Sequence, residues 1–195
     1  HLPTPVKRYL GGLKWDGRAR LDTLWVRYFG AADTALTRAL GACFGRVVTL
    51  DSPRARPPGQ FSWAATLWHE MAHVISLQMS NNRVPRWISE GISQFEERRG
   101  RPEWGHETEV MFVRALDAGK LLKLRDITEG FSDPRMINIV YQHASLLVEY
   151  VIATYGEPSL WRLLRAYGKG LETDAAFKEA FNATLDEVQA GFDKW

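Results

Sequence analysis

Two histidines and a glutamate in one short pattern constrain this chain more than any other feature. The pentapeptide HEMAH at residues 69–73 lies in a stretch from Ser62 to Met79 that contains no Gly or Pro and is largely apolar. The stretch therefore predicts a helix, and apolar residues on all of its sides predict that the helix is buried. Because His69 and His73 are four residues apart, their imidazoles lie on one helical face and can bind one ion.

Glu70 projects about 100° further round the same helix, so its carboxylate lies beside the ion rather than on it. From there it can take a proton from a water molecule at the metal, as the glutamate of an HExxH motif does in zinc hydrolases. The competing interpretation is a pair of core histidines hydrogen-bonded to nearby backbone. We favour a metal, because one cation satisfies all three buried polar side chains.

Zinc in a catalytic site needs a third protein ligand and keeps one position for water. The candidates are carboxylates and the three remaining histidines, which are His1, His106 and His143. The single cysteine, Cys43, lies upstream in a stretch that looks unrelated to the site. Iron, cobalt or manganese can occupy the same ligands, so zinc is inferred from the ligand types.

Glu90 is the strongest candidate for the third ligand. It lies on a second predicted helix, which follows a loop ending at Pro85 and has an apolar stripe. The stripe consists of Trp87, Ile88, Ile92 and Phe95. Gly91, next to the carboxylate, has no Cβ and so allows another backbone or a substrate to approach closely.

The HExxH helix, the loop and the segment Trp87-Ile88-Ser89-Glu90-Gly91 resemble the catalytic core of the gluzincin metallopeptidases, the clan of thermolysin and aminopeptidase N. Over about residues 45–195 the chain is most similar to bacterial peptidase-MA-like proteins. The interval from His73 to Glu90 is shorter than in aminopeptidase N, which implies a shorter loop. The resemblance implies one Zn²⁺ per chain, bound by His69, His73 and Glu90, with Glu70 as general base.

The resemblance also implies roles for residues around the metal. Glu97 matches an acidic residue that supports a metal-bound histidine, although a solvated charge is an equally good interpretation. Tyr141 opens a segment that resembles a later helix of the clan, in which a tyrosine donates to the oxyanion. The alternative for Tyr141 is an ordinary half-buried tyrosine. His143 is the second candidate for the oxyanion donor.

These roles predict zinc-dependent hydrolysis of peptide bonds, in which Glu70 transfers the proton and Tyr141 stabilises the oxyanion. The substrate is expected to be a peptide or protein. Aminopeptidases of the clan hold the substrate amine with an upstream motif, but this chain reads RPPGQFS at residues 56–62. The sequence therefore does not distinguish endopeptidase from exopeptidase. The alternative function is a non-catalytic protein-binding module with a vestigial metal site.

Residues 1–42 are expected to form a separate helical segment. They carry seven Lys and Arg against three Asp, and they resemble the start of the virulence-associated protein E family, which is linked to phage and plasmid helicase-primase ATPases. A mobile-element replication fragment, or a fusion of two genes, is thus a further alternative. However, no Gly-Lys-Ser/Thr phosphate loop follows. The positive charges are scattered, and we expect no nucleic-acid binding by the catalytic part.

The expected fold is α+β and mainly α, with a metallopeptidase domain over residues 45–195 that the resemblance makes thermolysin-like. A chain of 195 residues with 45% hydrophobic content can bury a core. We expect a strand at 45–50, a loop at 126–133, and helices at 107–122, 136–155, 160–167 and 175–195. No apolar run is long enough to span a membrane and no signal peptide is visible, so we expect a soluble protein, cytoplasmic or periplasmic/secreted. Oligomeric state is not indicated.

Overall fold

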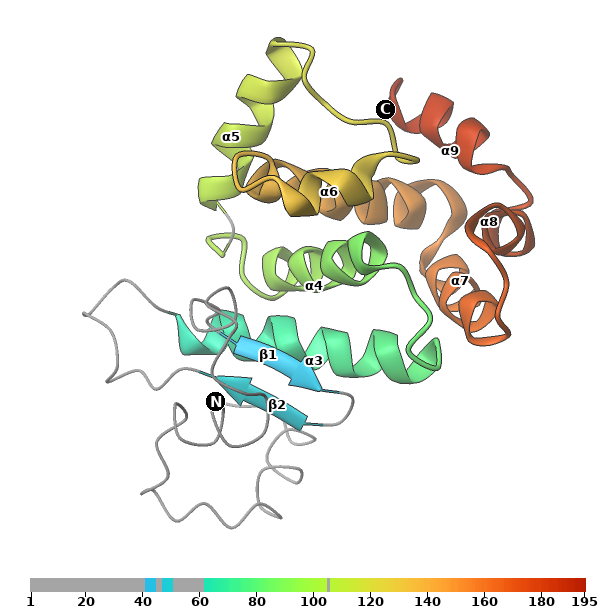
Figure 1. Ribbon diagram of the computed structural model, residues 1–195, viewed down its shortest axis with the longest axis horizontal. Coiled ribbons are helices and arrows are strands. Elements are labelled where there is room, and N and C mark those ends of the chain that lie inside the picture. Colours follow the sequence, from blue (N-terminus) through green and yellow to red (C-terminus); the bar gives the residue numbers. More distant parts are fainter. Residues whose placement is uncertain (1–40, 45–46, 51–61, 105) are drawn as a thin grey trace. The chain divides into compact units, whose positions relative to one another are not determined.

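In the computed structural model, residues 41–44, 47–50, 62–104 and 106–195 are described (Figure 1). Within these ranges the chain is mainly helical, with a sheet of two strands. This confirms the expected α+β fold that is mainly α. The expectations for residues 1–40 lie outside the described residues, as do residues 45 and 46 of the expected strand.

The sheet is a hairpin that precedes the histidine-bearing helix. Strands β1 (Gly41–Phe44) and β2 (Val47–Leu50) pair antiparallel, with Gly41 opposite Leu50. Both strands pack against helix α3 (Trp63–Met79), as Figure 1 shows. The sequence indicated the second strand but not the first. The motif helix therefore has a small sheet on one side.

Helix α3 forms where the sequence predicts it. The Ser62 side chain accepts a hydrogen bond from the Ala65 backbone N–H at 3.3 Å, which caps the first turn. After the helix, Asn81 and Asn82 both adopt positive φ, which asparagine tolerates, and the chain turns. The predicted burial is only partial, since Ile75 is half exposed. The buried face instead carries Ala65, Glu70, Ala72 and Ser76.

Helix α4 (Arg86–Gly100) packs between α3 and α6 (Ile137–Tyr155), so three helices form successive layers (Figure 1). Gly91 allows the close approach of α6. A Cβ atom placed on it would lie 2.7 Å from the Ala144 carbonyl oxygen, well inside van der Waals contact. The backbone that approaches Gly91 is therefore that of α6.

Several of the remaining helices pack directly on α6. Helix α5 (His106–Asp117) packs on it and ends earlier than predicted, because the chain turns at Gly119 with φ +63°. The expected loop at 126–133 contains a 3₁₀ helix, η2 (Ile127–Ser132).

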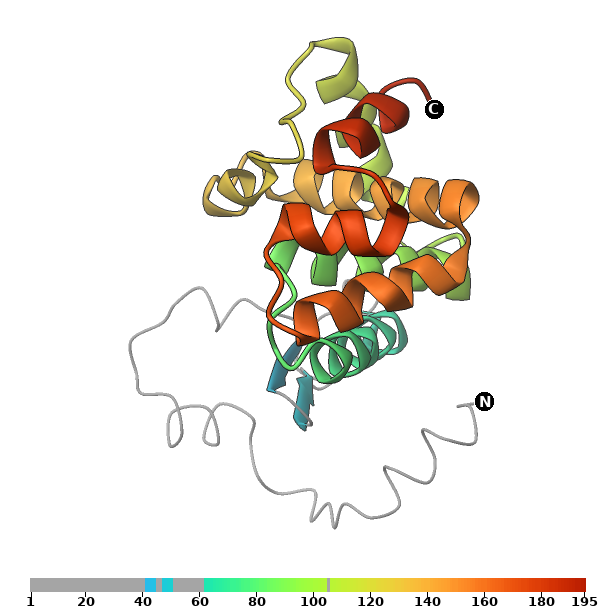
Figure 2. The ribbon, with the colours of Figure 1, turned by 90° about the vertical axis from the view of Figure 1, so that its right-hand side faces the viewer.

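Helix α7 (Glu157–Gly168) packs on α6, and α8 (Thr173–Phe181) lies beside α7 (Figure 2). Helix α9 (Leu185–Phe192) follows α8 in the sequence. The prediction of one helix over 175–195 is wrong, because Asn182 adopts a left-handed conformation that ends α8. No described helix is long and apolar enough to cross a membrane.

Candidate metal centre

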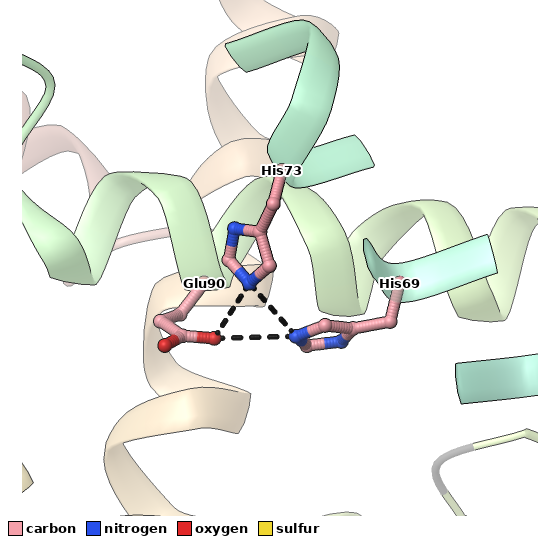
Figure 3. Close-up of side chains that lie close together, drawn as sticks. All are labelled: His69, His73 and Glu90. Atoms are coloured by element: carbon pink, nitrogen blue, oxygen red, sulfur yellow. Dashed lines mark hydrogen bonds and ion pairs between the residues drawn. The ribbon is translucent and has the colours of Figure 1, made fainter. Parts of the chain in front are cut away.

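Three side chains from two helices converge on one point (Figure 3). His69 and His73 come from α3 and Glu90 from α4. The two imidazole Nε2 atoms are 3.0 Å apart, and each is 3.2 Å from the same carboxylate oxygen, Oε2 of Glu90. The structure thus brings together the three residues that the sequence indicated as ligands.

The outer nitrogen of each ring has its own partner. His69 Nδ1 lies 2.5 Å from Oε1 of Glu97, and His73 Nδ1 lies 2.8 Å from Oγ of Ser89. A ring that donates its Nδ1 proton to such a partner presents a lone pair at Nε2. Of these two partners, Glu97 is predicted from the sequence and Ser89 is not.

This donor set fits a zinc ion. The two Nε2 atoms and the carboxylate oxygen face each other at 3.0–3.2 Å, so they share one cation, which is a proton on His69 in the metal-free site or a metal ion that displaces it. Zinc bonds of about 2.0–2.2 Å in a tetrahedral arrangement place ligand atoms about 3.3–3.6 Å apart, close to this spacing. Among the described residues, His69, His73 and Glu90 are the group of His, Cys, Asp or Glu side chains that lie close enough together to hold one metal ion.

The site concentrates negative charge in a buried setting. Burial alone would lower the pKa of His69, but hydrogen bonds to Glu90 and Glu97 raise it to about 10. Burial opposes ionisation of Glu90, but its contacts with His69 and His73 hold its pKa well below the usual range. Glu90 is only 8% exposed and stays ionised at neutral pH. The cluster therefore attracts positive charge.

Arg86 orients the carboxylate of Glu90 from one helical turn away. Its Nε donates to Oε1 of Glu90 at 3.2 Å, which leaves Oε2 to face both histidines. The guanidinium also lies 4.8 Å above the ring of Phe131 in η2. Arg86 was missed at the sequence level, although its place four residues before Glu90 on a predicted helix was a usable signal.

Tyr141 of α6 lies beside this cluster. Its ring centroid is 6.4 Å from that of His69 and 5.3 Å from that of Phe131. Burial raises the pKa of Tyr141 and the nearby charge of Glu90 raises it further, despite the opposing effect of Arg86. The phenol therefore remains protonated at neutral pH and can donate a hydrogen bond.

Glu70 is next to the three converging residues in sequence but faces the hairpin. It is 6% exposed, and a Cβ placed on Gly41 of β1 would lie 3.0 Å from its Cγ. Burial raises the pKa of Glu70, which suits a group that must both accept and release a proton. Burial and the charge of Glu70 raise the pKa of Cys43 to about 11, so this cysteine lies closer to the site than its sequence position suggested.

His143 lies on a different side of α6 from Tyr141. Its ring stacks on Phe192, with centroids 5.5 Å apart, and lies 5.8 Å from Phe112. Its Nδ1 is buried and has no hydrogen-bond partner among the described residues. Burial lowers the pKa of His143 to about 4. The structure thus brings Tyr141 to the cluster and packs His143 among aromatic side chains.

The comparisons with known proteins give one match. A family model described as the Peptidase MA superfamily matches residues 57–195, well over half of the chain. The matched range includes every residue of the cluster. No curated protein and no solved structure gives a significant match.

Proposed function

Because the chain belongs to the Peptidase MA superfamily, we propose that it is a zinc-dependent peptidase of the gluzincin type with a thermolysin-like core. The observation that carries the proposal is the convergence of His69, His73 and Glu90 on one point. This set of two imidazoles and one carboxylate is the set that catalytic zinc uses in peptidases. The substrate is a peptide or protein.

A bound zinc ion would lower the pKa of water at the site and polarise the scissile carbonyl. Glu70 is the group that takes the proton from the attacking water and returns it to the leaving amine. Its burial and raised pKa support this role, since a general base works best with a pKa close to the working pH.

Tyr141 is the proposed donor to the oxyanion. Its phenol keeps its proton at neutral pH and lies on the same side of the cluster as Arg86 and Phe131. A fixed donor at that position stabilises the charge that develops on the carbonyl oxygen. Glu97 and Arg86 act indirectly, because they hold His69 and Glu90 in place.

The experiment that tests the proposal separates metal binding from catalysis. Metal content is measured by elemental analysis in the wild type, His73→Ala and Glu70→Gln, and hydrolysis is followed with an unstructured protein such as casein. We expect about one zinc per chain in the wild type and in Glu70→Gln, and little in His73→Ala. Activity should fall by at least about 10²-fold in Glu70→Gln, since its amide cannot accept the proton.

Two results would contradict the proposal. A wild-type protein that holds no zinc after zinc is supplied excludes the metal centre. A Glu70→Gln variant that keeps full hydrolytic activity excludes the assigned general base. Zinc without hydrolysis of any peptide would instead favour the alternative, a binding module with a vestigial site.

A further inference from the structure

We infer that Ser89 and Ser76 are positioning residues that fix the tautomer and orientation of His73, so that its Nε2 lone pair faces the metal. The inference rests on the proposed zinc site. Ser89 comes from α4, and Ser76 lies one turn after His73 on α3. Both serines are buried, at 4% and 0% exposure.

The three residues form a closed chain of hydrogen bonds across the contact between the two helices. His73 Nδ1 lies 2.8 Å from Ser89 Oγ, and Ser89 Oγ lies 3.0 Å from Ser76 Oγ. Ser76 Oγ in turn donates to the carbonyl oxygen of His73 at 3.2 Å. The chain thus begins at the ring of His73 and ends at its own backbone.

The number of available protons decides which group donates and which accepts in each of these hydrogen bonds. A serine hydroxyl has one proton, and that of Ser76 is used on the His73 carbonyl. Ser76 Oγ must then accept from Ser89, whose single proton is used in that bond. Ser89 can therefore only accept from His73, which requires the proton of the ring to be on Nδ1. The remaining ring nitrogen, Nε2, is left with a lone pair.

The two histidines are thus held by different chemistry. His69 has a carboxylate at its Nδ1, whereas His73 has a neutral hydroxyl. A second carboxylate would add another negative charge to a buried cluster that already contains Glu70, Glu90 and Glu97. The serine pair orients the ring without that charge.

Ser93 offers a matched control on the same helix. It lies one turn after Ser89, is equally buried, and its Oγ has no hydrogen-bond partner among the described residues. Ser93→Ala also removes an Oγ atom from α4, but it leaves the hydrogen bonds to His73 intact. A loss of zinc affinity that comes only from removing a buried hydroxyl of α4 should therefore appear in both variants.

The experiment measures zinc affinity by competition with a chromophoric chelator, together with urea unfolding of the metal-free proteins. We expect Ser89→Ala to bind zinc about 10- to 100-fold more weakly than the wild type. Ser76→Ala should weaken zinc binding to a smaller extent. In that variant the Ser89 hydroxyl is free to donate to His73 Nδ1 instead of accepting from it, which favours the tautomer that cannot bind the metal through Nε2. The double variant should match Ser89→Ala, since both residues act through one chain. Ser89→Thr, which keeps the hydroxyl, should restore most of the affinity, and Ser93→Ala should leave it unchanged.

Three results would overturn the inference. They are unchanged zinc affinity in Ser89→Ala, an equal loss in Ser93→Ala, or additive losses in the double variant. The first of these results counts even where the metal-free stability of Ser89→Ala changes, because a positioning role must alter zinc affinity. If the wild type itself binds no zinc, the proposed function fails first, so the two failures are distinguishable.

Discussion

At the scale of single residues, Arg86 should control how Glu90 presents its carboxylate. We expect Arg86→Met to weaken zinc binding by about 10-fold, because Oε1 of Glu90 loses the hydrogen bond that orients it. Arg86→Lys should recover only part of this, since an ammonium lacks the planar geometry of the Nε–H donor. Chelator competition measures both. Arg99→Met is the matched control, because Arg99 is similarly exposed and pairs with Glu96 on the same helix. An equal loss in that control would show that only the net charge matters.

The burial of His143 leads to an independent prediction about how the unfolding free energy changes at acid pH. Its pKa is about 4 in the folded protein and about 6.5 in an unfolded chain. The unfolded state therefore binds the extra proton first as the pH falls, and stability present above pH 6.5 is lost between about pH 6.5 and 4. The loss should be on the order of 3 kcal/mol. Urea unfolding across this range should show a shallower pH dependence in His143→Leu than in the wild type. Parallel curves for the two proteins would contradict the assignment.

The sequence predicted the three converging residues because their spacing and types define them without any tertiary information. Glu97 and Tyr141 were identified through a resemblance, and their roles stay predictions. Ser76 was not predicted, and the role of Ser89 beside Glu90 was not recognised either. The bond between them crosses from α3 to α4, and single-residue patterns do not specify how two helices cross.

At the scale of elements, α4 connects the metal cluster to the rest of the helical core. One face directs Ser89, Glu90 and Glu97 toward α3. The other face contains Gly91 and Arg98, and Arg98 donates to Ser145 and Glu149 of α6 at 2.9 Å. A change in the distance between α4 and α6 should therefore also move Tyr141 relative to the three proposed metal ligands.

Gly91→Ala tests this coupling. The added methyl group would lie 2.7 Å from the Ala144 carbonyl oxygen, and the backbone there cannot move without shifting α6. We expect a loss of about 1–3 kcal/mol in unfolding free energy, measured with urea. Activity should fall further than zinc affinity, since Tyr141 is on α6 and the ligands are not. Gly100→Ala is the control, because its nearest neighbour is the Trp68 side chain at 3.3 Å, which can adjust. Equal effects at the two glycines would exclude a specific role for the α4–α6 contact.

Helix type and order were more predictable than helix ends. The helix at 63–79 follows from a largely apolar stretch without Gly or Pro, and the helices at 86–100 and 137–155 have Pro85 and Gly156 at their boundaries. The break at Asn182 was missed because asparagine is only an occasional left-handed residue, and nothing in periodicity marks it. Strand β1 was missed because its residues, GACF, include none that is β-branched, whereas three of the four residues of β2, VVTL, are β-branched.

At the scale of the whole folded part that the structure describes, the metal cluster joins two structural groups. Helix α3 with its hairpin supplies two of the proposed ligands, and α4, packed on α6, supplies the third. Bound zinc should therefore hold α3 and its hairpin against α4 and α6. Because an ion that binds only the folded state shifts the unfolding equilibrium, its effect appears in global stability and not only in activity.

The size of that effect can be stated in advance. At a free zinc concentration about 100-fold above Kd, the folded state gains about 2.7 kcal/mol, which raises Tm by roughly 5–10 °C for a domain of this size. Differential scanning calorimetry with zinc and then with excess chelator should show this shift and its reversal. Mg²⁺ should give none, because it prefers oxygen ligands. His73→Ala should lose the shift even though its metal-free Tm stays near that of the wild type. If zinc stabilises His73→Ala as much as the wild type, the ion binds elsewhere and does not join α3 to α4.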